Sequence, residues 1–244
     1  MIGWLEADWP APDGVRVIST YRTGGVSRGT YASLNLADHV GDDSADVLQN
    51  RQRLRALASL PAEPVWLKQV HGTAVYDADG HKAGPADASV SREKGRVLAI
   101  LTADCLPVML TSDTSEVIAA AHAGWRGLAS GVLEQTLDAM GLPAERLIAW
   151  LGPAIGPTHF EVGTEVRDAF LAHDRGVESA FRANPRGRFM ADLYALARRR
   201  LERLGVGRVF GGGLCTHADQ ERFFSHRRDG TTGRQATLIW REKR

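Results

Sequence analysis

Short apolar runs separated by turn residues dominate the pattern of the chain and predict a fold rich in β-strands. Runs of about four to eight apolar or alternating residues are typical of strands that lie in a core. The predicted strands are Val15–Thr20, Val65–Tyr76, Val97–Leu101 with an extension to Leu110, Val117–Ala121, Leu147–Leu151, Val209–Cys215 and Ala236–Trp240.

A helical spacing of apolar residues appears in four longer segments. The first has Ser44 as its predicted N-cap, and the second stops before Gly141, a residue type that commonly ends helices. Apolar runs that can be buried on both faces, together with helices, indicate an α/β (α+β) fold in which a mixed sheet or sandwich is covered by helices. No linker divides the chain, so we expect a single domain over residues 1–244. The predicted helices are Ser44–Leu57, Leu128–Met140, Thr164–His173 and Met190–Leu204.

The charge balance limits the kinds of partner that the protein can bind, and the cysteine content indicates its cellular compartment. With 30 Lys and Arg against 29 Asp and Glu, the formal net charge is +1, so no global field recruits nucleic acid or an anionic membrane. No apolar run approaches the roughly 20 residues of a membrane-spanning helix, and the N-terminus has no secretory pattern. Two cysteines are too few for a disulfide framework. We therefore expect a cytoplasmic monomer that binds a small molecule, with neither nucleic acid nor membrane as a partner.

Three segments share one design, in which an apolar strand ends at a reactive side chain and a turn with glycine or proline follows. They end at His71 before Gly72, at Asp104 and Cys105 before Pro107, and at His122 before Gly124. Strand ends that lead into loops are where enzymes commonly place functional groups. We therefore expect these side chains to meet in one site.

Two imidazoles and one thiolate form a ligand set that suits Zn²⁺. Three protein ligands leave the fourth tetrahedral position free, as in catalytic zinc sites. The sequence thus favours a catalytic zinc ion held by His71, Cys105 and His122.

The same residues permit two other interpretations. Cys105 can be the nucleophile of a metal-free Cys–His hydrolase with His71 or His122 as its base, or all three can be inert core residues. A second pair, Cys215 and His217, follows a run of glycines, and we interpret it as structural.

Two segments rich in glycine and arginine are candidates for binding an anion. Arg126 lies just before the helix predicted from Leu128, where free backbone N–H groups favour negative charge. The predicted loop from Phe223 to Arg234 contains three arginines, which suit a phosphate or a ribose. The alternatives are a surface salt bridge for Arg126 and an exposed hairpin for the loop.

Taken in order, the motifs of the chain resemble those of the YfiH family, whose members have been labelled polyphenol oxidases or laccase-domain proteins and later purine nucleoside phosphorylases. The match runs nearly end to end, although His226 stands where the family has a tyrosine. The motifs are Ser33-Leu-Asn-Leu36, His39-Val-Gly-Asp-Asp43, Gln69-Val-His-Gly72, Thr102-Ala-Asp-Cys-Leu-Pro107, His122-Ala-Gly-Trp-Arg-Gly127, Gly152-Pro-Ala-Ile-Gly156 and Phe223-Phe-Ser-His-Arg-Arg-Asp229.

This resemblance implies a mixed β-sandwich flanked by helices, with zinc held by the residues that match His71, Cys105 and His122. It also implies phosphorolysis of adenosine, inosine, guanosine and methylthioadenosine, and deamination of adenosine. The copper oxidase label is disfavoured, because the eight histidines form no His-x-His or His-Cys-His element of the kind that a multicopper cluster needs.

A phosphorolytic site must hold an anion beside the sugar and stabilise the departing base. We assign Arg126 and Arg227 to phosphate, and Asn35 and Gln69 to hydrogen bonds with the nucleoside. Asp104 is the candidate for proton transfer or for orienting a metal ligand, which makes it a catalytic candidate alongside Cys105, His71 and His122.

Overall fold

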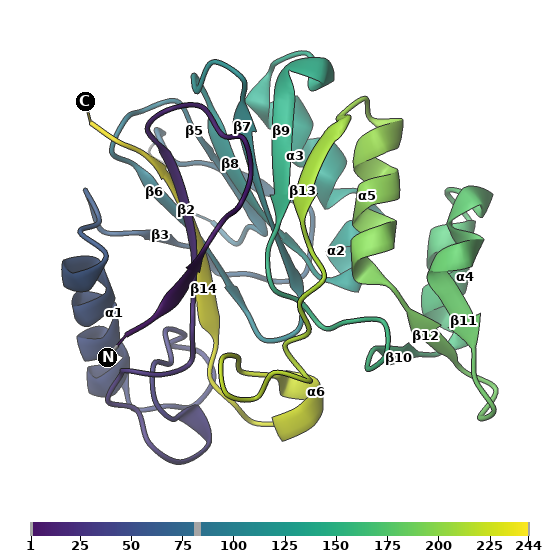
Figure 1. Ribbon diagram of the computed structural model, residues 1–244, viewed down its shortest axis with the longest axis horizontal. Helices are drawn as coiled ribbons and strands as arrows, with labels where there is room; N and C mark the ends of the chain where they lie inside the picture. The colour runs from purple at the N-terminus through teal and green to yellow at the C-terminus, as the bar shows by residue number, and fades with distance from the viewer. Residues whose placement is uncertain (1, 81–83, 244) are drawn as a thin grey trace.

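The apolar runs form two sheets that pack face to face, as the computed structural model shows for residues 2–80 and 84–243 (Figure 1). Both sheets are mixed, because the pairs β3–β6, β4–β5 and β9–β13 are parallel and their other pairs are antiparallel. The five-stranded sheet has the order β1 (Trp4–Glu6), β2 (Val15–Thr20), β14 (Gln235–Arg241), β6 (Val97–Thr102) and β3 (Val65–Trp66). The six-stranded sheet has the order β13 (Arg208–Gly211), β9 (Leu147–Leu151), β7 (Leu106–Ser112), β8 (Ile118–Ala123), β5 (Ala88–Ser91) and β4 (Val75–Asp77).

Alternation along the strands builds three apolar layers. In β6, Leu98 and Ile100 face the interior of the sandwich, whereas Val97, Ala99 and Leu101 belong to the cluster on the other side of the sheet. Successive side chains of a strand point to opposite faces, so β6 is buried on both. This explains why its sequence is a continuous apolar run.

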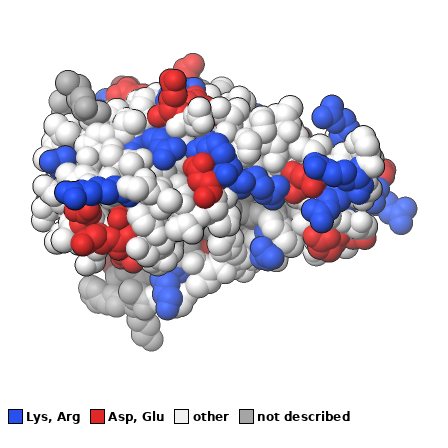
Figure 2. Space-filling view, turned by 90° about the horizontal axis from the view of Figure 1, so that it is seen from below, with Lys and Arg blue, Asp and Glu red and all other residues white. Residues whose placement is uncertain are grey.

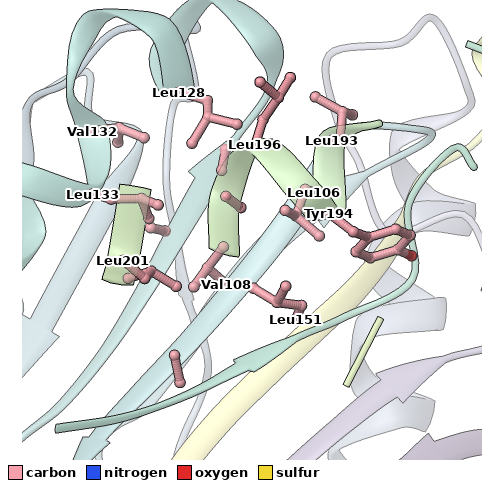
Figure 3. Packing of buried hydrophobic residues seen from close by; sticks show 14 of the residues in the cluster. Leu106, Val108, Leu128, Val132, Leu133, Leu151, Leu193, Tyr194, Leu196 and Leu201 are labelled. Carbon is pink, nitrogen blue, oxygen red and sulfur yellow. The ribbon is translucent and has the colours of Figure 1, made fainter. Parts of the chain in front are cut away.

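Helices cover the outer faces of the sandwich. The helix α1 (Ser44–Leu57) lies beside the five-stranded sheet, with Leu54 in its apolar cluster. The other sheet is covered by α2 (Trp125–Ser130), α3 (Val132–Met140) and α5 (Leu193–Arg203), whose leucines meet Val108 and Leu151 (Figure 3). The predicted sandwich flanked by helices is confirmed.

A smaller sheet and several short helices complete the described structure. The sheet has the order β10 (Glu161–Val162), β12 (Phe189–Ala191) and β11 (Phe181–Ala183), and it lies beside α4 (Thr164–Leu171) at one side of the molecule (Figure 1). The short helices are η1 (Gly29–Tyr31), η2 (Ala144–Arg146), η3 (Arg175–Ala180) and α6 (His226–Asp229). No helix within residues 2–80 and 84–243 has the length and apolar character needed to cross a membrane.

Two predicted strands are each divided between the sheets. The segment 65–76 forms β3 in one sheet and β4 in the other, and the segment 97–110 forms β6 and β7 with a break at residues 103–105. Both breaks contain a residue other than glycine with positive φ, His71 at 61° and Asp104 at 93°. The chain therefore crosses between the sheets at the residues that were predicted to be reactive.

Element ends differ from prediction where glycine or a cap interrupts the pattern. The predicted helix from Leu128 begins earlier, at Trp125, and is broken at Gly131, which has a φ of 100°. Met190 lies in β12 instead of a helix, because Asp192 caps α5 with its side chain. Similarly, Asp43 and not Ser44 caps α1. The strand predicted to reach Cys215 ends at Gly211, the first of three glycines with positive φ.

We predict that Gly131→Ala lowers the free energy of unfolding by about 1–2 kcal/mol, because an L-residue is strained in the left-handed region. Space is not the reason, since an added Cβ would meet its nearest neighbour at 3.5 Å. Urea denaturation of this variant should be compared with that of Gly207→Ala, where the φ is ordinary and nothing lies within 4 Å. Equal stability of the two variants would show that the break at Gly131 carries no strain.

Candidate metal centre

Three side chains from three chain segments converge at one end of the sandwich. His71 lies on the connection between β3 and β4, Cys105 on that between β6 and β7, and His122 within β8. Their ligand atoms all lie within 4.8 Å of one another, and Cys105 Sγ is 3.9 Å from His71 Nε2. Among the described residues, this is the one group of three such side chains with metal-binding geometry. His122 is 3% exposed, Cys105 is half-buried and His71 is exposed, so the group opens toward solvent on one side.

A buried carboxylate, Asp87, holds two of these residues in place. Its Oδ1 accepts hydrogen bonds from His122 Nδ1 at 2.8 Å and from the backbone N–H of His71 at 2.9 Å. Its Oδ2 accepts the N–H groups of Val70 and Gly72. The side chain is fully buried. Its two oxygens accept hydrogen bonds from four N–H groups, which stabilise the buried negative charge. This arrangement leaves Nε2 of His122 free to face Cys105.

The electrostatics of the group favour an anionic carboxylate and an anionic sulfur. Burial by itself would raise the pKa of Asp87, but the hydrogen bonds from His122 and from backbone N–H groups outweigh it and lower that pKa. Burial would likewise raise the pKa of Cys105, but the charge of His122 and hydrogen bonds from both histidines lower it to about 6. The reverse balance raises the pKa of His122 to about 9, since Cys105 and Asp87 outweigh its burial. The thiolate is the form of cysteine that binds metals.

Two glycines let the segments approach this closely. A Cβ on Gly124 would lie 2.9 Å from Cys105 Sγ and 3.2 Å from His71 Cδ2. A Cβ on Gly127 would lie 2.8 Å from the carbonyl oxygen of Gly72, so α2 packs directly on the loop that carries His71. The glycines after His122 are thus needed for space and not for a turn alone.

The three side chains line a cavity of about 470 Å³ at the end of the sandwich that carries α6. Figure 2 shows this end of the molecule, with basic and acidic side chains interspersed over its surface. Aromatic and apolar walls come from Trp125, Ile155 and Phe160, and the rim carries His39 and His226. Three arginines also line the cavity, namely Arg126, Arg227 and Arg234.

The three arginines differ in exposure, but none of those described is paired with a carboxylate in a salt bridge. Arg126 is exposed and stacks on Trp125 at 4.4 Å, and Arg227 donates to the carbonyl of Glu161 at 2.8 Å. Arg234 is half-buried, and its Nη1 donates to two neighbouring carbonyls. Within the described residues, none of the three forms a salt bridge with a carboxylate. The cavity therefore offers guanidinium groups that are not held in a salt bridge with a carboxylate. Sequence analysis did not single out Arg234 as a site residue.

The structure gives three other predicted site residues internal partners. Gln69 lines the cavity, but its amide pairs with both the N–H and the carbonyl of Leu101. Asn35 is fully buried and outside the cavity lining, where its carbonyl oxygen accepts the N–H of Arg234. Asp104 accepts from the hydroxyl of Thr216 at 2.7 Å and from the N–H of Arg227 at 2.6 Å. These three side chains organise the walls of the cavity.

Asp87 and Arg234 were missed by sequence analysis for different reasons. Asp87 precedes the four-residue strand β5 and belongs to no motif, so nothing in the sequence marks it. Arg234 is the last residue of the loop that was predicted to bind an anion. Its position directly before β14 is the sequence feature that could have identified it as a site residue.

The chain is similar to known proteins over nearly its whole length. The family described as multi-copper polyphenol oxidoreductase laccase matches residues 16–242. The purine nucleoside phosphorylase YfiH of Escherichia coli is 51% identical over 238 residues, which cover 97% of this chain and 98% of the relative. The chain belongs to the YfiH family. Another relative, a purine nucleoside phosphorylase of Pseudomonas aeruginosa, is 54% identical over 242 residues, covering 98% of this chain and 99% of the relative.

Two solved structures have the same fold as this chain over nearly its whole length. A crystal structure of a Neisseria meningitidis protein of the family DUF152 superposes with a TM-score of 0.93 and 48% identity, covering 98% of this chain and 99% of that one. YlmD of Geobacillus stearothermophilus gives a TM-score of 0.89 at 34% identity, covering 99% of this chain and 97% of that one.

We predict that Asp87→Asn weakens Zn²⁺ binding roughly 10- to 100-fold, the usual effect of losing a carboxylate that orients a ligand. Each oxygen of Asp87 accepts two N–H groups, so either orientation of the asparagine amide places its NH₂ against donors. Affinity is measured by competition with a chromogenic chelator, and thermal melting checks the fold. The control is Asp13→Asn at an exposed position. If the folded Asp87→Asn protein bound Zn²⁺ with wild-type affinity, Asp87 would have no role in orienting the metal ligands.

Proposed function

We propose that this YfiH-family protein is a zinc-dependent purine nucleoside phosphorylase that acts on adenosine, inosine, guanosine and methylthioadenosine. The observation that carries the proposal is that a metal-binding group and three arginines without carboxylate partners line the same cavity. The names of relatives that are 51% and 54% identical support the reaction class. We further propose that the protein is cytoplasmic, in keeping with its two free cysteines, and that it is a monomer.

The donor set fits zinc. Two imidazole nitrogens and a sulfur are typical zinc ligands, and His122 is oriented through Nδ1 by Asp87, as metal-bound histidines usually are. His71, Cys105 and His122 would hold the ion and leave a coordination position toward the cavity. When bound, zinc supplies a Lewis acid at this position, able to polarise an oxygen or activate water.

Phosphorolysis requires residues that bind phosphate and residues that bind the purine base. Phosphate attacks C1′ of the ribose, the bond from C1′ to the purine nitrogen breaks, and the departing base takes up a proton. The guanidinium groups of Arg126, Arg227 and Arg234 would bind the phosphate through charge-assisted hydrogen bonds. Trp125 and Phe160 offer flat apolar surfaces to the purine, since aromatic faces stack on bases. We assign Asp104 to positioning Arg227, whose N–H it accepts.

We extend the proposal to deamination of adenosine, which removes the amino group at C6 with water. The same cavity serves both reactions, because the ligand set leaves one metal position open. Deamination needs no bound phosphate, so the two reactions differ in their demand on the arginines.

A metal-free Cys–His hydrolase is the second candidate, favoured by one observation. Asp87, His122 and Cys105 follow one another in the order of a catalytic triad, with the carboxylate on Nδ1 and the thiol on the other side of the ring. Such a triad leaves His71 without a role, although its Nε2 lies 3.9 Å from the same sulfur. Zinc dependence of turnover separates the two functions.

The proposal is tested by a product assay with adenosine, with and without phosphate. We expect adenine and ribose 1-phosphate only with phosphate, and inosine in both cases. Removal of zinc by a chelator should abolish both products, and one equivalent of zinc should restore them. Cys105→Ala should be inactive, whereas Cys215→Ala should retain most of its activity. Full activity of the zinc-free protein, or copper at several equivalents per chain, would reject the proposal.

We predict that Arg126→Ala raises the phosphate concentration needed for half-maximal phosphorolysis about 10- to 100-fold, because a hydrogen bond to a charged group contributes roughly 1.5–3 kcal/mol. Deamination and zinc content should stay close to wild type. Arg234→Ala should show the same separation of the two reactions. The control, Arg53→Ala, removes an exposed arginine of α1. A parallel loss of both activities and of zinc would show that Arg126 braces the loop of His122 instead.

A further inference from the structure

His226 lies on the rim of the cavity, and the chain around it holds its imidazole in place. Its Nδ1 is 2.6 Å from the carbonyl oxygen of Gly230, and the backbone N–H of Gly230 donates in return to the carbonyl of His226 at 2.9 Å. The backbone N–H of the next residue, Arg227, donates to the buried Asp104. The ring and the short helix that carries it are therefore fixed through both backbone and side chain.

The bond to Gly230 decides which ring nitrogen of His226 is available to a ligand. A carbonyl oxygen only accepts hydrogen bonds, so Nδ1 of His226 carries a proton. In the neutral ring, Nε2 then has no hydrogen and is an acceptor. Among residues 2–80 and 84–243 no hydrogen bond is formed at this Nε2, and the side chain is exposed. The rim thus presents an acceptor that lacks a partner.

This acceptor complements the arginines of the cavity. Guanidinium groups only donate hydrogen bonds, which suits phosphate, whereas the acceptor beside Arg227 requires a hydroxyl or amino group. In phosphorolysis the phosphate attacks C1′ on the face of the sugar opposite the base, and the 2′- and 3′-hydroxyls of a ribose lie on that same face. A side chain next to the phosphate-binding Arg227 is therefore suited to these hydroxyls and not to the purine.

We propose that His226 is a specificity-determining residue whose Nε2 accepts a hydrogen bond from the 2′,3′-diol of the nucleoside. The cavity therefore prefers ribonucleosides to nucleosides that lack these hydroxyls. The inference rests on the proposed phosphorylase function, because phosphorolysis fixes the face of the sugar that the phosphate approaches. The C5′ substituent lies on the other face, so nucleosides that are modified only at C5′, such as methylthioadenosine, keep the contact with His226.

Binding of inosine to the zinc-loaded protein in phosphate-free buffer tests this contact without turnover. Inosine has no 6-amino group to lose, and it is not phosphorolysed when phosphate is absent. Calorimetry should give a dissociation constant for 2′,3′-dideoxyinosine about 3- to 10-fold higher than that for inosine, the range expected for one hydrogen bond between neutral groups. The control ligand is 5′-deoxyinosine, which retains the diol.

Two substitutions separate the roles of the two ring nitrogens. His226→Asn keeps an N–H group near the position of Nδ1, which preserves the bond to Gly230, but has no group at the position of Nε2. Its affinity for inosine and for 5′-deoxyinosine should fall about 3- to 10-fold, while its affinity for 2′,3′-dideoxyinosine stays unchanged. His226→Gln places an amide oxygen near the position of Nε2 and should retain the wild-type preference. The matched control is His173→Asn, at an exposed position outside the cavity lining.

Equal affinity of the wild type for inosine and 2′,3′-dideoxyinosine would overturn the proposal, and this comparison needs no variant. The reverse order of the variants, with His226→Gln impaired and His226→Asn unchanged, would also overturn it, because His226 would then only hold the helix in place. Melting temperature verifies that each variant is folded. Inosine binding without turnover after phosphate is added would reject the phosphorylase function alone. No binding of inosine to the wild type would reject both.

Discussion

The buried carboxylate of Asp87 is the interaction on which the candidate metal centre depends. It joins a side chain of β8 to the backbone of the loop that carries His71, and both of its oxygens are fully used. A buried charge is tolerated only where donors surround it. Here the donors are Nδ1 of His122 and the backbone N–H groups of residues 70–72. The hydrogen bonds that offset the cost of burying the carboxylate therefore also hold His71 and His122 in position.

The two-sheet architecture explains why the remaining residues meet where they do. The chain passes from the five-stranded to the six-stranded sheet twice at the same end, once through His71 and once through residues 103–105. Each passage uses a residue other than glycine with positive φ. Such backbone is costly and persists only where the surroundings enforce it. Asp87 bonds to one passage, and Thr216 and Arg227 bond to the other through Asp104.

The sequence predicts much of this fold, and its failures have specific physical causes. The bounds of β2, β9 and α1 agree with prediction, because glycine or proline lies near one end of each segment: Gly14 before β2, Gly152 after β9 and Pro61 after α1. The predicted strand runs on from β6 into β7 because both are buried on each face, and Asp104 is the sequence signal that marks the break between them. The three reactive segments could be found because in each of them an apolar run leads to a reactive side chain near a glycine or proline. Asp87 could not, because its role is created by contacts with residues distant in the chain.

A net charge of +1 describes the molecule as a whole and conceals the character of its cavity. Acidic and basic side chains are interspersed over the face shown in Figure 2, and such exposed charges are screened over about 8 Å at physiological ionic strength. The half-buried guanidinium of Arg234 is screened less, because burial limits the approach of counterions and water. Burial also lowers the pKa of this arginine, against the opposing charges of Cys105 and Asp104. The anion binding proposed for this cavity therefore depends on the local placement of a few arginines, which composition cannot reveal, and it is compatible with a nearly neutral protein.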